Sequence, residues 1–151
     1  MIFLVRHAHA ESRSDWDGPD RGRPLSDKGH LQAKRLAELL ISWGAGSVVS
    51  SPFLRCVQTV LPLANVLGVA VDESAALAEG AGGEEAARLI AVGSAGTVIC
   101  SHGDVLHDVV GRLAAGGAPV DTGTPFEKGA VLWLERDGTS VIRAGYEAPP
   151  N

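Results

Sequence analysis

Three short segments of the chain carry arginine or histidine side chains at the end of an apolar run or within the turn and helix start that follow it. The first holds Arg6 and His7, the second holds Arg55, and the third holds His102. The planar guanidinium group of arginine matches the oxygens of a phosphate in a bidentate manner, and imidazole nitrogens also bind such anions. If the fold places the three segments together, they form a positive site suited to a dianionic phosphoryl group.

The elements that must position these residues follow from apolar patterning. Short apolar runs without polar alternation are typical of strands buried on both faces, and they alternate with segments of helical periodicity. We expect strands at 2–5, 47–50, 69–71 and 97–101, helices at 27–43, 52–67, 84–92 and 104–115, and a closing hairpin of 130–135 with 140–143. This order predicts an α/β fold with a mostly parallel sheet. Residues 11–25 are charged and contain Gly and Pro, which predicts a long loop.

In such sheets, ligands bind at the carboxyl ends of the strands. The three segments follow three of the predicted strands, so we expect two arginines and two histidines to meet at one edge. Helix N-termini that begin at the same edge also favour anions. Taken singly, each of these residues is more often a surface or capping residue, and the hypothesis rests on their combination.

Composition limits the alternatives. With 151 residues, we expect one domain spanning 1–151. The net charge of −5 gives no general attraction to nucleic acid or to anionic lipid, so neither is an expected partner. Cys56 and Cys100 lack a CxxC spacing and predict reduced thiols in a cytoplasmic protein. The N-terminal apolar run is too short for a signal peptide, and no apolar stretch approaches the roughly 20 residues of a membrane span.

Together, the motifs LVRHA, SSPFLRCVQT and ICSHGD resemble the three motifs of the histidine phosphatase superfamily, which has the phosphoglycerate mutase-like fold. RPLSDKGHLQA is similar to the family's helix start, so the resemblance covers nearly the whole chain. The length resembles the small SixA-type phosphohistidine phosphatases. SRSDWDGPDRGRPLS also resembles a phosphatase-like domain fused behind some bacterial Nudix hydrolases. One departure is Ala8, where much of the superfamily has glycine.

The resemblance implies a three-layer α/β sandwich and a metal-independent phosphatase without a cofactor. It carries His7 over as the nucleophile that forms a phosphohistidine, and Arg6, Arg55 and His102 as the phosphate-binding groups. No set of residues has the spacing of metal ligands, so no metal is expected. The family usually supplies a carboxylic acid after the third strand, and Glu79 occupies a matching position. Members of SixA type often lack this carboxylate.

Several alternatives stay open. Glu84 and Glu85 are the next choices for the acid, although both resemble charges at a helix start. Arg13 is a further candidate for substrate binding, and Arg21 and Arg23 in the same loop either meet additional phosphates or are solvated charges. The expected substrate is a phosphohistidine protein, a nucleotide polyphosphate or a small phosphomonoester.

Two other functions fit the motifs less well. A mutase would need a long insertion that covers its site, and no such insertion is present. A non-catalytic phosphate- or phosphopeptide-binding domain would not need the full set of site residues. The oligomeric state is not predicted by the sequence.

Overall fold

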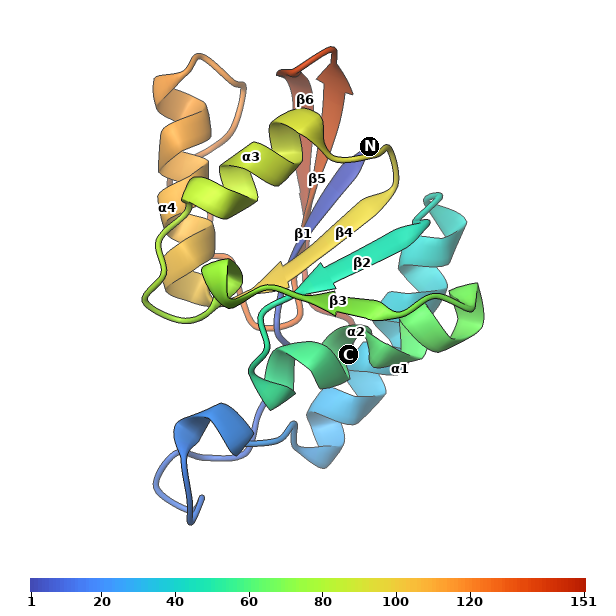
Figure 1. Cartoon of the computed structure of the whole chain (residues 1–151), viewed down its shortest axis with the longest axis vertical. Helices are drawn as coiled ribbons and strands as arrows, with labels where there is room; N and C mark the ends of the chain where they lie inside the picture. The colour runs from blue at the N-terminus through green and yellow to red at the C-terminus, as the bar shows by residue number, and fades with distance from the viewer.

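A computed structural model describes the whole chain, residues 1–151. Its centre is a six-stranded sheet in the order β3-β2-β4-β1-β5-β6, shown edge to edge in Figure 1. The strands are β1 (Ile2–Arg6), β2 (Ser47–Ser50), β3 (Val71–Glu73), β4 (Thr97–Ser101), β5 (Val131–Asp137) and β6 (Ser140–Glu147). The first four strands in that order run parallel to one another, and β5 and β6 are antiparallel to their neighbours. The predicted α/β fold with a mostly parallel sheet is confirmed.

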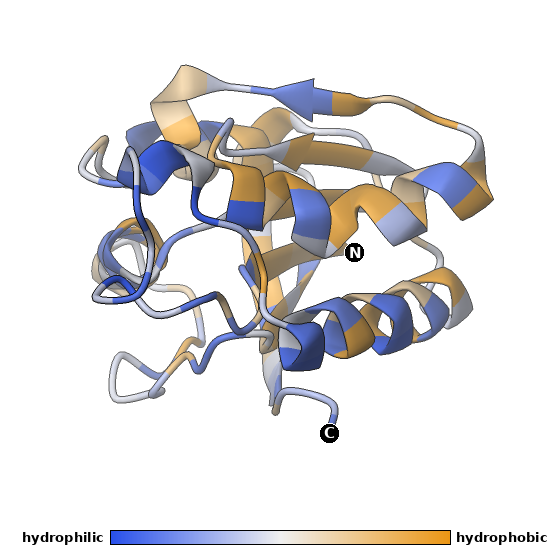
Figure 2. Cartoon of the chain, turned by 90° about the horizontal axis from the view of Figure 1, so that it is seen from below, coloured by the Kyte–Doolittle hydropathy of each residue, from blue (hydrophilic) through white to orange (hydrophobic).

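Helices cover both faces of the sheet (Figure 1). On one face lie α1 (Asp27–Ser42) and α2 (Leu54–Leu67), and on the other lie α3 (Glu84–Val92) and α4 (Gly103–Ala115). Each face has its own apolar core, because buried β1 side chains alternate between the faces: Phe3 packs with α1 and α2, whereas Leu4 packs with α3 and α4. Figure 2 shows hydrophobic residues concentrated in the sheet and on the helix sides that face it.

Local sequence signals account for the ends of the helices. The Ser26 hydroxyl accepts a hydrogen bond from the Gly29 N–H and caps the first turn of α1. Gly68 ends α2 in the left-handed conformation, with φ of +70°, which a residue with a Cβ rarely adopts. No helix of the structure combines the length and the apolar character that a membrane crossing requires.

Several predicted boundaries were wrong. The helix expected to start at Pro52 starts at Leu54, because the hydroxyl of Ser51 accepts the Phe53 N–H and holds 51–53 as a turn. The third strand lies at 71–73 instead of 69–71, because pairing with β2 sets its register. The loop 11–25 contains a short 3₁₀ turn, η1 (Asp20–Gly22), and a second turn, η2 (Ala75–Leu77), follows β3. Both strands of the hairpin are longer than expected.

Candidate active site

Strand register brings the three chemical segments together. Arg6 at the end of β1 pairs with Ser101 at the end of β4, so His7 and His102 follow side by side. On the other side of β4, Ser50 at the end of β2 pairs with Cys100. The carboxyl ends of three neighbouring parallel strands therefore lie at the same side of the sheet, and the polar residues that follow them lie together there. A cavity of about 440 Å³ opens there, and both His7 and His102 line it.

Two glycines permit the close approach of the segments around this cavity. A Cβ at Gly103 would lie 2.9 Å from the guanidinium carbon of Arg6, so the glycine leaves room for that side chain. A Cβ at Gly29 would lie 1.9 Å from the His9 carbonyl oxygen, so only glycine lets the loop after β1 rest on α1. Ala8 is fully buried and packs with Leu25, so the chain accommodates alanine where the family pattern has glycine.

The contacts of the His7 ring fix its orientation and its protonation state, as a neutral nucleophile requires. Its Nδ1 lies 2.8 Å from the Ala8 carbonyl oxygen, which only accepts, so Nδ1 carries the proton and Nε2 keeps its lone pair. Burial lowers the pKa of His7 to about 3, and the neighbouring Arg55, His102 and Arg6 side chains lower it further, against the Ala8 hydrogen bond. At neutral pH the imidazole is therefore uncharged and its Nε2 is free.

His102 is buried in a polar and aromatic socket. Its Nε2 lies 2.8 Å from the Ser51 hydroxyl, which also accepts the Phe53 N–H, and 3.5 Å from the sulfur of Cys56. The Phe53 ring meets the His102 ring edge to face, with centroids 4.8 Å apart. These contacts fix the ring through Nε2 and one face, and they leave Nδ1 for another partner.

The two predicted arginines are positioned by contacts on their far sides. Arg6 Nη1 donates to the carbonyl oxygen of Phe126 at 2.9 Å, and Phe126 has a strained φ of +41° that aims this carbonyl. Arg55 is completely buried and donates through Nη1 to the Asp20 carbonyl oxygen and through Nη2 to the Asp20 carboxylate, at 2.9 and 3.1 Å. Its guanidinium also lies over the Phe53 ring. Burial lowers the pKa of Arg6, which still remains cationic.

Three buried side-chain nitrogens have no hydrogen-bond partner in the structure, and all three belong to predicted site residues: Arg6 Nε, Arg55 Nε and His102 Nδ1. A buried donor without a partner costs about 1–3 kcal/mol. Buried donors without partners are kept at sites where a bound ligand supplies the missing acceptors. Arg55 itself does not line the open cavity and contributes to the site from beneath it.

Glu79 lines the cavity but is held between two guanidinium groups. Its Oε1 lies 3.0 Å from Arg13 Nη2 and its Oε2 lies 3.5 Å from Arg55 Nη2. A proton-donating role for Glu79 therefore requires Arg13 to move aside. The alternatives Glu84 and Glu85 do not line the cavity, and Glu85 pairs with Arg88 on the surface of α3. Of the candidate acids considered from the sequence, only Glu79 lies at the site.

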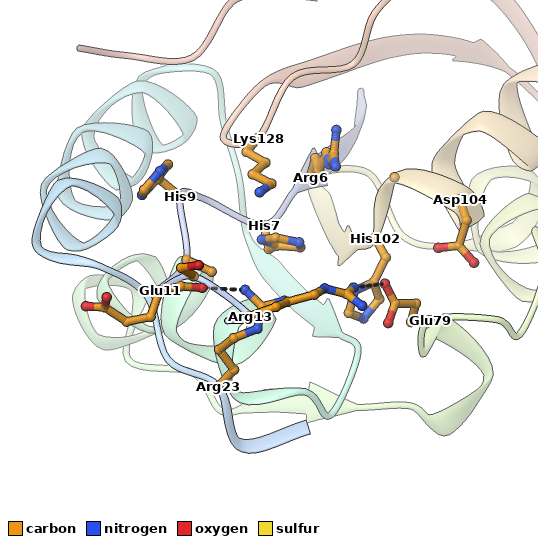
Figure 3. Close-up of a pocket in the computed structure, with 13 residues that line it drawn as sticks. Arg6, His7, His9, Glu11, Arg13, Arg23, Glu79, His102, Asp104 and Lys128 are labelled. Atoms are coloured by element: carbon orange, nitrogen blue, oxygen red, sulfur yellow. Dashed lines mark hydrogen bonds and ion pairs between the residues drawn. The ribbon is translucent and has the colours of Figure 1, made fainter. Parts of the chain in front are cut away.

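Sequence reasoning missed several residues at the cavity (Figure 3). Lys128 lies on the opposite side of the His7 ring from Arg23 in this view, and only its position before a predicted strand could have drawn attention to it. Asp104 is a second missed residue that lines the cavity. His9 lines it too, and its place in the loop just after His7 already made contact with a ligand possible. Arg23 is buried and faces the cavity, so it is not a solvated charge, whereas Arg21 does not line the cavity.

The geometry offers anion-binding groups without a metal-binding cluster. No group of three or more His, Cys, Asp or Glu side chains is arranged to hold a metal ion. The positive charge at the site comes from side chains that approach from several elements. A phosphoryl group or another small tetrahedral anion is the ligand that this arrangement fits.

Comparison with known proteins agrees with this geometry. The model of the histidine phosphatase superfamily (branch 1) matches residues 2–89. The chain therefore belongs to this superfamily. The 8-oxo-(d)GTP phosphatase of Mycolicibacterium smegmatis is 32% identical over 156 residues, which cover 99% of this chain and 48% of that protein. The chain thus spans about half the length of this relative.

Solved structures share the fold at lower sequence identity. The protein histidine phosphatase SixA, in complex with tungstate, has a TM-score of 0.77 and 22% identity, and the match covers 97% of this chain and 94% of that chain. The structure of SixA from Agrobacterium tumefaciens, which is named as a phosphohistidine phosphatase, has a TM-score of 0.76 and 20% identity over 99% and 97% of the two chains. These matches establish the phosphoglycerate mutase-like, helix-covered sheet.

Proposed function

We propose that this chain is a metal-independent phosphatase that transfers a phosphoryl group first to His7 and then to water. The observation that carries the proposal is the set of three unpartnered buried nitrogens on Arg6, Arg55 and His102. Three donors that lack acceptors beside a neutral imidazole form a socket for phosphoryl oxygens. The family membership of the chain supports the same reaction.

In the first step, His7 Nε2 attacks phosphorus and the bond from phosphorus to the leaving group breaks. The Ala8 carbonyl holds the Nδ1 proton, so the imidazole needs no general base. Its pKa of about 3 keeps it unprotonated over the physiological range. The ring becomes a phosphorylated imidazolium, whose positive charge is stabilised by the Ala8 carbonyl oxygen and by the dianionic phosphoryl group.

The transition state is stabilised by donors already in place. Charge on the transferring phosphoryl group spreads over its equatorial oxygens, and fixed donors around it act without reorganisation. Arg6 and Arg55 offer Nε–H groups, and His102 offers Nδ1–H when Nε2 accepts from Ser51. Glu79 supplies a proton to a poor leaving group when Arg13 releases it.

In the second step, water attacks the phosphorus of the phosphohistidine and the bond from phosphorus to His7 Nε2 breaks, which releases inorganic phosphate and restores the neutral imidazole. The cavity supports hydrolysis over transfer to a second substrate, because its rim is exposed: the side chains of Arg13 and Glu79 are 65% and 37% exposed. A mutase must exclude water from its phosphoenzyme. A non-catalytic binding domain would have no use for an imidazole held with a free Nε2.

A nucleoside polyphosphate is the substrate class we favour. The support is the 32% identity, over nearly the whole chain, to a protein named 8-oxo-(d)GTP phosphatase. A phosphohistidine protein is the second candidate, supported by the similarity in fold to SixA. A small phosphomonoester is the third, and all three classes present the same terminal phosphoryl group to the socket.

Phosphoenzyme trapping tests the reaction. The protein is mixed with γ-³²P-labelled GTP or a labelled aryl phosphate and quenched in base, and we expect an acid-labile label at His7. His7→Ala should lose the label and the turnover, whereas His107→Gln, a change on the exposed side of α4, should keep both. Turnover by a folded His7→Ala variant at the wild-type rate would show that His7 is not the nucleophile.

A further inference from the structure

Arg23 is buried, but it also lines an open cavity. Only 5% of the residue is exposed, yet it lines the cavity that holds His7. A buried guanidinium on a loop that faces an open site is unusual, because arginine is seldom buried unless it is paired or bound. Whether Arg23 can bind a ligand depends on which of its N–H groups already donate to acceptors within the chain.

Two hydrogen bonds fix the guanidinium of Arg23, and some of its N–H donors remain without a partner. Arg23 Nε donates to Asp20 Oδ1 at 2.9 Å, and Nη1 donates to the Glu11 carbonyl oxygen at 2.6 Å. Nη2 makes no hydrogen bond within the chain. Figure 3 shows the Arg23 side chain reaching from the loop toward the space beside the His7 ring. Its remaining N–H groups are therefore held in place and available to a ligand.

Asp20 ties this arginine to the phosphoryl socket. One carboxylate oxygen of Asp20 accepts from Arg23, and the other accepts from Arg55 Nη2 at 3.1 Å. Burial opposes the charge on Asp20, but the hydrogen bond from Arg23 and the charges of the nearby arginines outweigh it and hold its pKa below the ordinary value. The two guanidinium groups are consequently neighbours, one beneath the socket and one beside it.

The cavity carries more positive charge than one phosphoryl group needs. Burial lowers the pKa of Lys128, and the charges of Arg6, Arg23, Arg13 and Arg55 lower it further. Lys128 also forms no ion pair within the chain, so these cations act on one another in the same space. Their mutual repulsion would be relieved by an anion with more than one charged group.

The acidic residues of the cavity neutralise some of its cationic groups and leave others without a carboxylate partner. Glu79 is engaged by Arg13 and lies near Arg55, and the Asp104 carboxylate accepts the Gly80 N–H. Glu11 is exposed and contacts Arg23 through its backbone only. The free N–H groups of Arg23 and the ammonium of Lys128 are left without carboxylate partners.

We propose that Arg23 is a specificity-determining residue that binds the phosphate of the leaving group, so that the site prefers phosphoanhydrides to phosphomonoesters and phosphoramidates. The proposal rests on the function proposed above. In the step it describes, His7 Nε2 bonds to the terminal phosphorus and the bond from that phosphorus to the bridging oxygen breaks. The bonding electrons stay on the bridging oxygen, and Arg23 Nη2 donates to the phosphate that gains the charge. No proton is needed for this leaving group.

The test compares two substrates and two neighbouring arginines. The substrates are GTP, which has a phosphate in its leaving group, and p-nitrophenyl phosphate, which has none. Arg23→Gln should lower kcat/KM for GTP by roughly 10- to 100-fold more than it lowers kcat/KM for the aryl phosphate, because only GTP loses a charged hydrogen bond to its leaving group. Any effect through Asp20 on Arg55 is shared by both substrates. Arg21→Gln is the matched control in the same loop, outside the cavity, and should change neither value.

A binding measurement keeps the test independent of turnover and of a variant that folds poorly. By calorimetry, inorganic pyrophosphate should bind the wild-type protein at least about 10-fold more tightly than phosphate. This ratio should shrink toward one in Arg23→Gln. Arg23→Lys retains the charge and the stem, so it is used if the glutamine variant does not fold, and it should reduce the ratio by a smaller factor.

The outcomes are distinct. An equal loss on both substrates would mean that Arg23 only anchors the loop or binds the scissile phosphoryl group, and an unchanged GTP rate would mean that it binds nothing in the reaction. Wild-type turnover of the aryl phosphate without turnover of GTP would overturn the anhydride preference and leave the proposed phosphatase intact. Failure of the wild-type protein to turn over either substrate would instead remove the proposed function, and the role of Arg23 with it.

Discussion

Arg55 beneath the cavity and Arg13 on its rim both contact the carboxylate of Glu79, yet their surroundings differ. The Arg55 side chain is 1% exposed, and Asp20 and the Phe53 ring hold it. The Arg13 side chain is 65% exposed, and Glu79 is its single charged partner. A buried guanidinium keeps one geometry, whereas an exposed ion pair contributes little free energy and exchanges readily. The floor is thus suited to stabilise a transition state, and the rim is suited to open for a substrate.

The largest effect expected from this contrast is the loss of Arg55. Arg55→Ala should lower kcat/KM about 10³-fold, because removal of one preorganised charged donor commonly costs roughly 3–4 kcal/mol of transition-state stabilisation. Arg55→Lys should restore little, since a single ammonium lacks the planar guanidinium fork whose separate N–H groups face Asp20 and the phosphoryl group. Steady-state kinetics and vanadate binding measure the effect, with circular dichroism to confirm folding. Full rescue by lysine would show that Arg55 acts only as a diffuse charge.

Glu79 should show an effect that depends on the leaving group. If the carboxylic acid donates a proton, Glu79→Gln should slow the hydrolysis of alkyl phosphates by about 10²-fold and leave aryl phosphates nearly unchanged. Kinetics across leaving groups of graded pKa measure this. An equal loss across the series would leave Glu79 with a role in positioning Arg13 and Arg55 alone.

Arg13 should matter far less than Arg55. Because exposed ion pairs contribute about 0–1 kcal/mol, we expect Arg13→Ala to change kcat/KM for an aryl phosphate by less than about 5-fold. A loss comparable to that of Arg55→Ala would place Arg13 among the groups that stabilise the transition state.

Burial at the floor of the cavity should also affect the titration of His7. Its pKa of about 3 lies below the value near 6.5 in the unfolded chain, so the unfolded state binds the proton first as the pH falls. His7 should therefore cost stability as the pH decreases from about 6.5, at up to about 1.4 kcal/mol per pH unit. Imidazole NMR signals, assigned with His7→Gln, should not titrate at His7 between about pH 8 and about pH 5. A midpoint near 6.5 at His7 would contradict the buried, neutral state.

The smallest expected effect is that of chelation. Since arginine and histidine donors surround the socket, saturating EDTA should leave turnover of an aryl phosphate unchanged. The measurement compares the rates before and after dialysis against the chelator. Loss of activity that a single divalent ion restores would show that the donors on Arg6, Arg55 and His102 are insufficient.

Much of this site could be predicted from the sequence. The apolar runs before His7 and His102 are typical of buried parallel strands, and ligands bind where such strands end. The spacing within each motif is local, so the positions of Arg6, His7, Arg55 and His102 relative to their own strands follow from the chain itself. Their roles as nucleophile and phosphate-binding groups stay predictions that the variants above will test.

Tertiary structure decided what local pattern cannot encode. Strand register placed Ser101 beside Arg6, and burial lowered the pKa of His7 to about 3. The side chain of Arg23 belongs to a charged loop that resembles any solvated segment, and only packing against Asp20 and Glu11 buried it at the cavity. Lys128 reached the same cavity from far along the chain. Burial and long-range contacts depend on which segments meet in space, and the order of residues within one segment does not contain that information.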